Sequence, residues 1–287
     1  MDFHSHRPNG LSVVRLTLWV IVVAVIVVPI GAVVSIGLGG NHVRVLLDAG
    51  IVDAAVNSAV SAGVSAALAV VIAVAMALVL DRTDLPGRNI VRLILLSPLL
   101  IPPFVGAIAW TGLLGPSGMI NKFWAEQFGG PLWNIYGGDG VIFLLTLHSY
   151  PLAYLIVAAA LRRIPGDLEQ AARVAGASPW RALRDATLPL LRTAAIAAFT
   201  LTAVSNLADF GIPALIGLPD RYVTLSTMVY RFIQSGTVAK PLEVVSTIGI
   251  VLLVLAVAAV AVDRVLVDVA VAVLVHSVAD LCRARVD

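Results

Sequence analysis

The sequence is poor in charge and in aromatic residues. Asp, Glu, Lys and Arg make up 13% of its 287 residues, and Phe, Trp and Tyr make up 6%. Soluble domains carry about 25% charged residues, whereas this chain is 60% apolar, with a mean hydropathy of +0.99. No stretch has the composition of a water-soluble domain, so we expect an integral membrane protein.

Several kinds of chemical site are missing as well. Cys282 is the single cysteine, which excludes an internal disulfide and a zinc or iron–sulfur site built from cysteines. The motifs G-x-x-x-x-G-K-[ST], H-E-x-x-H and G-x-S-x-G do not occur. The five histidines are scattered and the net charge is only +2, so we expect no metal site, no cofactor in this chain and no nucleic-acid partner.

Long apolar runs are what the sequence has in abundance. A bilayer core of about 30 Å needs about 20 apolar residues in a helix. We therefore predict a bundle of six spans at residues 16–38, 54–80, 93–114, 140–161, 193–217 and 244–262. Pro98, Pro102 and Pro103 predict a break in the third span. Residues 265–279 are short and carry two polar side chains, so we interpret them as an interfacial or poorly defined tail rather than a seventh span.

The positions of Lys and Arg predict the orientation. If residues 1–15 lie inside, the extracytoplasmic segments carry only Arg44, Lys122, Arg221, Arg231 and Lys240 of the 19 Lys and Arg. Because cytoplasmic loops are enriched in Lys and Arg, we expect both termini, residues 1–15 and 263–287, on the cytoplasmic side. The basic start and the absence of a cleavage site favour an uncleaved first span.

Two spans carry polar side chains at helical spacing. Asn57, Ser61 and Ser65 in the second span predict close packing against another helix. In the fifth span, Asn206 and Asp209 lie on one face with Thr202 and Ser205. That face is expected to point into the bundle or a pathway. Asp209 then has either a gating role or a structural hydrogen bond at the helix end.

The basic segment 162–192 is unusually well specified for a loop. Pro165-Gly166 ends the preceding helix, and Asp167 with Gln170 has the spacing of a capping box. A stripe of small apolar residues follows, namely Leu168, Ala171, Ala172 and Ala175. Gly176 predicts the end of this first short helix.

A second short helix is predicted directly afterwards. Ser178-Pro179 gives its cap and first turn, Trp180, Leu183 and Thr187 share one face, and Leu188-Pro189 ends it. Two helices joined at a glycine form a rigid cytoplasmic object. It either binds a partner through its small-residue stripe or is a surface loop whose Arg residues satisfy the positive-inside rule.

The same segment resembles the EAA signature of permease subunits in binding-protein-dependent ABC importers, E-A-A, three residues, G, nine residues, I, one residue, L-P. The residues that match in type and spacing are Ala171, Ala172, Gly176, Leu188 and Pro189. Gln170 stands where the family has Glu, although Glu169 is adjacent, and Ala186 stands where Ile is usual. The resemblance implies that residues 169–189 are the coupling helix that docks into a cytoplasmic ATPase.

A wider resemblance covers roughly residues 10–262. Leu96-Ser97-Pro98 with Pro102-Pro103, His148-Ser149-Tyr150-Pro151 and Ala208-Asp209-Phe210-Gly211-Ile212-Pro213 are similar to the ferric iron, thiamine, polyamine and 2-aminoethylphosphonate permease group. The chain resembles the first half of double-length ferric permeases. This implies an all-α type I importer fold and a second permease chain or a copy of this one.

The resemblance also implies the partners and the location. They are an ABC ATPase dimer that holds ATP and Mg, an extracytoplasmic solute-binding protein that delivers cargo, and the lipid of a bacterial inner membrane. Ferric iron is the leading cargo. A secondary transporter or channel that needs no ATPase is the alternative from another class, although such proteins commonly show inverted repeats and several intramembrane ionisable groups.

Overall fold

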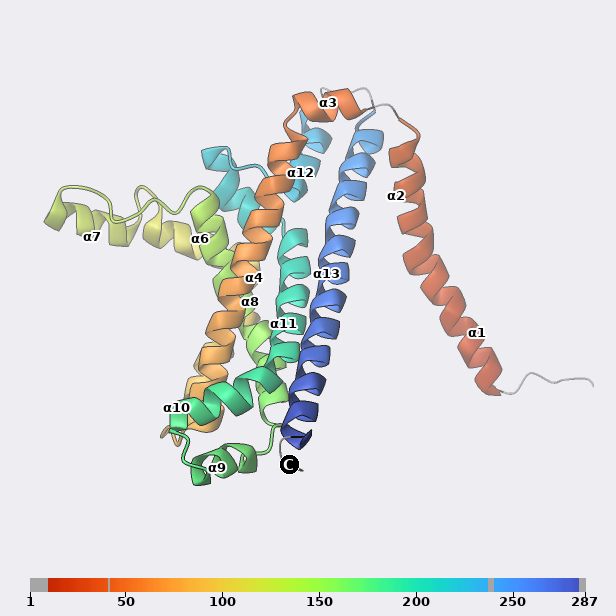
Figure 1. Cartoon of the computed structure of the whole chain (residues 1–287). Coiled ribbons are helices and arrows are strands. Elements are labelled where there is room, and N and C mark those ends of the chain that lie inside the picture. The colour runs from red at the N-terminus through yellow and green to blue at the C-terminus, as the bar shows by residue number, and fades with distance from the viewer. Residues whose placement is uncertain (1–9, 41, 237–239, 284–287) are drawn as a thin grey trace, which may run out of the picture. The chain divides into compact units, whose positions relative to one another are not determined.

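The computed structural model describes residues 10–40, 42–236 and 240–283, and within them every regular element is helical (Figure 1). The predicted cytoplasmic end at residues 1–9 and the last four residues of the tail lie outside the described residues. The elements are α1 (Gly10–Val22), η1 (Val23–Val27), α2 (Val28–Leu38), α3 (Val43–Asp48), α4 (Ile51–Arg82), α5 (Arg88–Leu96), η2 (Ser97–Leu100), α6 (Pro103–Leu114), α7 (Met119–Phe128), α8 (Gly138–Leu161), α9 (Asp167–Val174), α10 (Pro179–Ala182), η3 (Leu183–Thr187), α11 (Leu188–Ala208), η4 (Pro213–Gly217), η5 (Leu218–Asp220), α12 (Leu225–Ser235) and α13 (Pro241–Arg283).

The described residues contain six helical stretches that are long and apolar enough to cross a membrane. They are residues 13–38, 51–82, 103–128, 138–161, 179–208 and 241–262. The all-α class with six spans is thereby confirmed. A proline lacks the N–H that an interior helical position donates, and the chain is interrupted as expected at Ile101-Pro102, between η2 and α6.

Several boundaries differ from the sequence prediction. The third apolar stretch is 103–128 rather than 93–114, because it begins after the break at Pro102 and includes α7. The fifth span ends at Ala208, not at 217, because Asp209 adopts an extended conformation. Its helix starts earlier than 193, since η3 joins α10 directly to α11. Residues 265–279 form no separate tail, because they continue α13, a single helix from Pro241 to Arg283.

The chain divides into two compact units, residues 1–51 with 229–251 and residues 52–228 with 252–287. In the first unit, α2 packs closely against the first part of α13 at Gly37. A Cβ at this glycine would lie 2.7 Å from Ile250 and 2.9 Å from the backbone of Ser246, so only glycine permits this approach. Thr247 Oγ1 donates a hydrogen bond to the Gly37 carbonyl at 3.0 Å.

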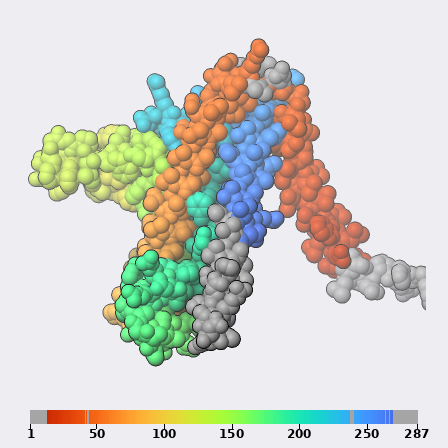
Figure 2. Space-filling model, in the orientation of Figure 1, coloured from red at the N-terminus to blue at the C-terminus, as the bar shows by residue number. Residues whose placement is uncertain are grey.

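In the second unit, α8 packs along α11 through small side chains. Ala153 and Ala158 of α8, Ala73 and Ala77 of α4 and Ala198 of α11 are fully buried in one cluster. Small residues let helix backbones approach closely where lipid offers no hydrophobic driving force. Figure 2 shows the segment of α6 and α7, in yellow-green, standing out from the rest of this unit.

Candidate coupling segment and polar cluster

The two short helices of the predicted coupling segment meet at Gly176, as expected. Gly176 has φ +93°, a left-handed conformation that glycine adopts without strain. Its N–H donates to the Arg173 carbonyl, and the Ala177 N–H donates to the Ala172 carbonyl, both at 3.0 Å. These two bonds form a Schellman motif, which provides donors for the last carbonyls of α9 and fixes the direction of the chain at Gly176. We call α9, Gly176 and α10, residues 167–182, the elbow.

The start of α10 is also as expected, whereas the start of α9 is not. Ser178 caps α10 and accepts a hydrogen bond from the Arg181 N–H at 3.3 Å, with Pro179 in the first turn. The predicted capping box at Asp167 is wrong. The N-cap position belongs to Gly166, which has no side chain to cap with, and Asp167 is the first helical residue.

Glu169 is turned inward, onto its own chain. Its Oε1 lies 3.4 Å from Nε of Arg82 at the end of α4, and it accepts a hydrogen bond from Thr187 Oγ1 at 2.5 Å. Arg82 Nη2 also donates to the carbonyl of Ile164 at 3.1 Å. Glu169 therefore ties α9 to α4 and to η3, whereas its neighbours Gln170 and Ala171 are exposed, as is Gly176.

Ion pairs also join the end of α4 to α5 and to the end of α8. Asp81 Oδ1 accepts a hydrogen bond from Arg92 Nη2 at 2.7 Å, and Arg162 Nε lies 3.5 Å from the same oxygen. Arg92 Nε donates to the Tyr154 hydroxyl at 3.0 Å. The ends of α4, α5 and α8 are thus fixed together beside the elbow.

Apolar side chains project from the elbow. Val174 is 90% exposed and Trp180 66% exposed, and Leu168, Ala171 and Ala175 are exposed too, while Ala172 is half-buried. Of the residues predicted to share one face of the second short helix, Trp180 is exposed, whereas Thr187 is fully buried beside Glu169. A groove of about 310 Å³ runs between the end of α4 and the elbow, with Arg82, Glu169, Arg173 and Pro179 in its walls.

Leu188-Pro189 does not end the second short helix. The two residues begin α11, after the wide turn η3, in which the Leu188 N–H donates to the Leu183 carbonyl. A wider turn removes the need for a Pro189 N–H and leaves room for its ring. Leu188 and Pro189 therefore join the elbow to the fifth span.

Inside the bundle, Asn206 connects three helices. Its Nδ2 donates to Ser65 Oγ of α4 at 2.8 Å and lies 3.3 Å from Ser149 Oγ of α8. The face that carries Asn206 was predicted to point into the bundle or a pathway. Asn206 and Thr202 are buried in the bundle, whereas Ser205 on the same face is exposed. The Asn57–Ser65 stripe also packs as expected, since Tyr222 donates to the Asn57 carbonyl and Ser65 accepts from Asn206.

Asp209 lies where α11 ends. Its Oδ1 accepts a hydrogen bond from the Ile212 N–H at 3.0 Å, the arrangement of an N-cap for the following turn. Its carbonyl accepts from Ser226 Oγ at 2.8 Å. Asp209 also interacts electrostatically with His148 of α8.

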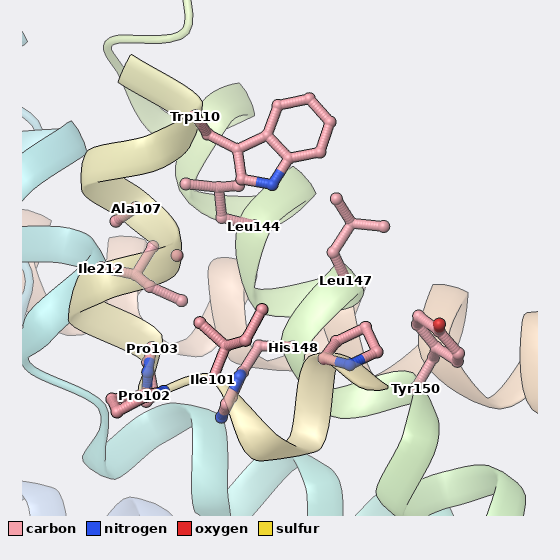
Figure 3. Close-up of a pocket in the computed structure, with 12 residues that line it drawn as sticks. Ile101, Pro102, Pro103, Ala107, Trp110, Leu144, Leu147, His148, Tyr150 and Ile212 are labelled. Carbon is pink, nitrogen blue, oxygen red and sulfur yellow. The ribbon is translucent and has the colours of Figure 1, made fainter. Parts of the chain in front are cut away.

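His148 lines an apolar cavity of about 200 Å³ at the break between η2 and α6. Figure 3 shows its ring turned toward Ile101 and Pro102, with Trp110 and Leu144 on the opposite wall. No group of three His, Cys, Asp or Glu side chains that could hold a metal ion occurs in the part of the chain that the structure describes.

Comparison with known proteins decides the family. Residues 69–278 match the family described as "Binding-protein-dependent transport system inner membrane component". The chain belongs to this family. The family that the sequence resemblance implied is thereby confirmed, and both the elbow and the Asn206 cluster lie within the matched residues.

Relatives of this family member are named for two different cargoes. This chain is 28% identical over 162 residues to a putative ferric transport system permease protein, FbpB 1 of Haemophilus influenzae. The aligned residues make up 56% of this chain and 25% of the relative. The chain is 29% identical over 159 residues to the molybdenum transport system permease protein ModB of Escherichia coli, covering 55% of this chain and 69% of the relative. The match thus spans about a quarter of the length of the ferric relative.

The fold of this family member resembles solved ABC transporters. A bacterial alginate ABC transporter in complex with an alginate-bound periplasmic protein matches with a TM-score of 0.72 and 18% identity, over 90% of this chain and 94% of the other. The MetNI methionine ABC transporter matches with a TM-score of 0.57 and 21% identity, over 79% and 99%. These likenesses support the type I importer fold expected from the sequence.

Sequence reasoning missed the residues that hold the elbow in place. Arg82 stands at the end of a predicted span, where a basic residue indicates only the membrane boundary. Its pairing with Glu169 joins positions far apart in the chain, and no local pattern marks it. Val174 lies inside the motif, but only the direction of α9 shows that it points away from the protein.

Proposed function

We propose that the chain is the membrane permease subunit of an ATP-driven importer, and that the elbow of α9 and α10 is its docking element for a cytoplasmic ATPase. The observation that carries this is the exposure of Val174 and Trp180 on a backbone fixed by the Gly176 Schellman motif. Rigid, exposed apolar side chains are typical anchors of a protein interface.

In this proposal Gln170, Ala171 and Ala172 face or border the ATPase cleft, and Glu169 holds α9 in position from inside. Gly176 shapes the elbow, and Leu188 and Pro189 pass its displacement into α11. ATP and Mg are bound by the ATPase dimer. Each conformational state of the permease must bind its partners with a different free energy for ATP to drive transport.

The remaining partners follow from the same assignment. An extracytoplasmic binding protein delivers the cargo, and a second permease chain or a copy of this one completes the path. We assign Asn206 in α11 and Asp209 at the end of this helix to the substrate path or gate. We propose an inner-membrane location with both termini in the cytoplasm.

Ferric iron is the cargo that we propose, because several similar proteins are named for ferric transport. Molybdate is the second candidate, since ModB proteins match over a comparable length. Thiamine, a polyamine or a phosphonate is less supported. Uptake of radioactive ferric iron or molybdate into proteoliposomes that contain permease, ATPase and binding protein separates these cargoes.

The docking role is tested by cross-linking. Val174→Cys in a Cys282→Ser background is expected to cross-link to cysteines placed in the cleft of the co-expressed ATPase, and Trp180→Asp is expected to abolish co-purification. Glu126→Cys on α7 is the matched exposed control and should give no cross-link. Uptake by the purified permease without nucleotide would instead favour a secondary transporter and contradict the proposal.

A further inference from the structure

Helix α7, Met119–Phe128, is a short amphipathic helix that the proposed transport mechanism does not use. Figures 1 and 2 show that it leaves the end of α6 sideways, away from α4, α8 and α11. Phe123 and Phe128 are 64% and 67% exposed, and Met119 is equally exposed. Protein surfaces in water rarely gather exposed apolar side chains in this way.

The position of α7 is fixed by one buried side chain, Asn121. This residue is 1% exposed, and its Nδ2 lies 2.9 Å from the Leu114 carbonyl at the end of α6 and 2.8 Å from the Trp133 carbonyl. Its Oδ1 accepts hydrogen bonds from the N–H groups of Leu132 and Trp133. The first turn of α7 is therefore held directly against the last turn of α6.

The returning chain is anchored at a second point. The Trp133 ring packs edge-on against Phe143 of α8, with centroids 5.4 Å apart, and its Nε1 donates to Asp139 Oδ2 at 2.7 Å. Two fixed points, Asn121 and Trp133, hold the segment from both ends. The sideways direction of α7 is thus built into the fold.

The chain length between Arg92 and α7 is that of a membrane span. Arg92 pairs with Asp81 beside Arg162, a cluster of charges that suits one boundary of the membrane. From Arg92 to Leu114 the chain has roughly 20 residues, about the number that a hydrocarbon core of about 30 Å requires, and α6 then ends before α7 begins at Met119. This length suits a position of α7 at the opposite interface.

The side chains of α7 suit a position at the membrane interface. At 100° per residue, Met119, Ile120, Phe123, Trp124 and Phe128 share one half of the helix with a single polar residue, Gln127, whereas Lys122 and Glu126 lie on the other half. Val105 and Ile108 of α6 are exposed as well. Aromatic rings on the apolar side and charges on the polar side are typical of helices that lie in the headgroup region.

We propose that α7 is an interfacial helix that binds the lipid surface of the membrane, with Phe123 and Phe128 in the acyl region and Lys122 and Glu126 among the headgroups. The lipid then fixes the outer end of the broken span formed by α5, η2 and α6, beside the cavity lined by His148. The inference concerns this chain and the bilayer alone, and it stands whether or not the ATPase docks at the elbow.

Spin labels in liposomes of phosphatidylethanolamine and phosphatidylglycerol test this. Single cysteines are introduced in a Cys282→Ser background at Phe123, Phe128, Lys122 and Glu126, with Val105→Cys on α6 as the lipid-facing reference. We expect labels at 123 and 128 to collide more with oxygen than with a water-soluble nickel chelate, as at 105, and labels at 122 and 126 to show the reverse.

Three outcomes would overturn the proposal. If all four α7 labels favour the nickel chelate, the helix lies in water. If labels at 123 and 128 are immobile and shielded from both quenchers, a protein surface such as a second copy covers them. If all four favour oxygen, α7 is immersed in the hydrocarbon rather than lying along its surface.

Discussion

Glu169 of α9 lies 3.4 Å from Arg82 at the end of α4, measured from Oε1 to Nε, so the proposed docking helix is tied to a membrane span by an ion pair within the chain. Both side chains are about one-fifth exposed. A charge pair screened to this extent contributes about 1 kcal/mol, and leaving one partner alone costs somewhat more.

We therefore expect Glu169→Gln to lower the stability of the purified permease by about 1–2 kcal/mol. Combined with Arg82→Gln, it should show a coupling energy of similar size in a double-mutant cycle. Thermal unfolding in detergent measures both. Gln170→Ala, at the exposed neighbour, is the control and should stay near the wild-type midpoint. A larger loss for Gln170→Ala than for Glu169→Gln would contradict the inward role of Glu169.

Gly176→Ala should weaken the elbow by about 1–2 kcal/mol, the cost of a left-handed conformation for an L-residue. The loss comes from backbone strain alone, because an added Cβ meets nothing within 4 Å. Gly63→Ala in α4 is the matched control, since its Cβ also meets nothing and its φ is not positive. The thermal unfolding midpoints of the Gly176→Ala and Gly63→Ala variants measure this difference. Equal midpoints would mean that the Schellman motif is dispensable.

Asn206→Leu should destabilise the bundle, because Ser65 and Ser149 lose a donor that joins their helices. Interhelical hydrogen bonds in membranes contribute about 0.6 kcal/mol on average and at most about 1.7 kcal/mol. Ser205→Ala, on the exposed side of the same turn, should be neutral. The unfolding midpoint in detergent checks both variants, and a neutral Asn206→Leu would show that the cluster does not hold the three helices together.

Asp209→Ala should cost about 1 kcal/mol through loss of its cap on the Ile212 N–H. Asp209→Asn keeps an oxygen acceptor there and should retain the wild-type midpoint. Cargo uptake by the Asn variant then distinguishes the two roles of Asp209. Normal uptake means that capping is its whole role, and lost uptake at unchanged stability assigns it to the pathway or gate.

The membrane character and the elbow could be predicted because their signals are local. Apolar runs and proline mark the spans and the break at Pro102, and a glycine at fixed spacing from Ser178 marks the elbow. The prediction of a capping box was wrong because Asp167 is the first residue of the helix rather than its N-cap. The spacing of Asp and Gln alone does not decide which residue occupies the cap.

The contacts that position the site could not be predicted, because they join distant parts of the chain. Arg82 with Glu169, and Asn206 with Ser65, depend on how spans pack in three dimensions. The prediction that the second short helix ends at Pro189 was wrong for a different reason. A π-type turn can absorb a proline without ending the helix, and no sequence pattern that we applied distinguishes the two outcomes.

The wide turn η3 leaves no loop between α10 and α11, so one continuous helical path runs from Pro179 to Ala208, and Figure 1 shows it bending where α10 meets α11. A π-type turn inside a helix often marks such a bend. The Gly176 Schellman motif and the Thr187–Glu169 hydrogen bond hold α9 against this path. In the docking role that we propose, α10 and the fifth span would therefore respond to the ATPase as one bent piece.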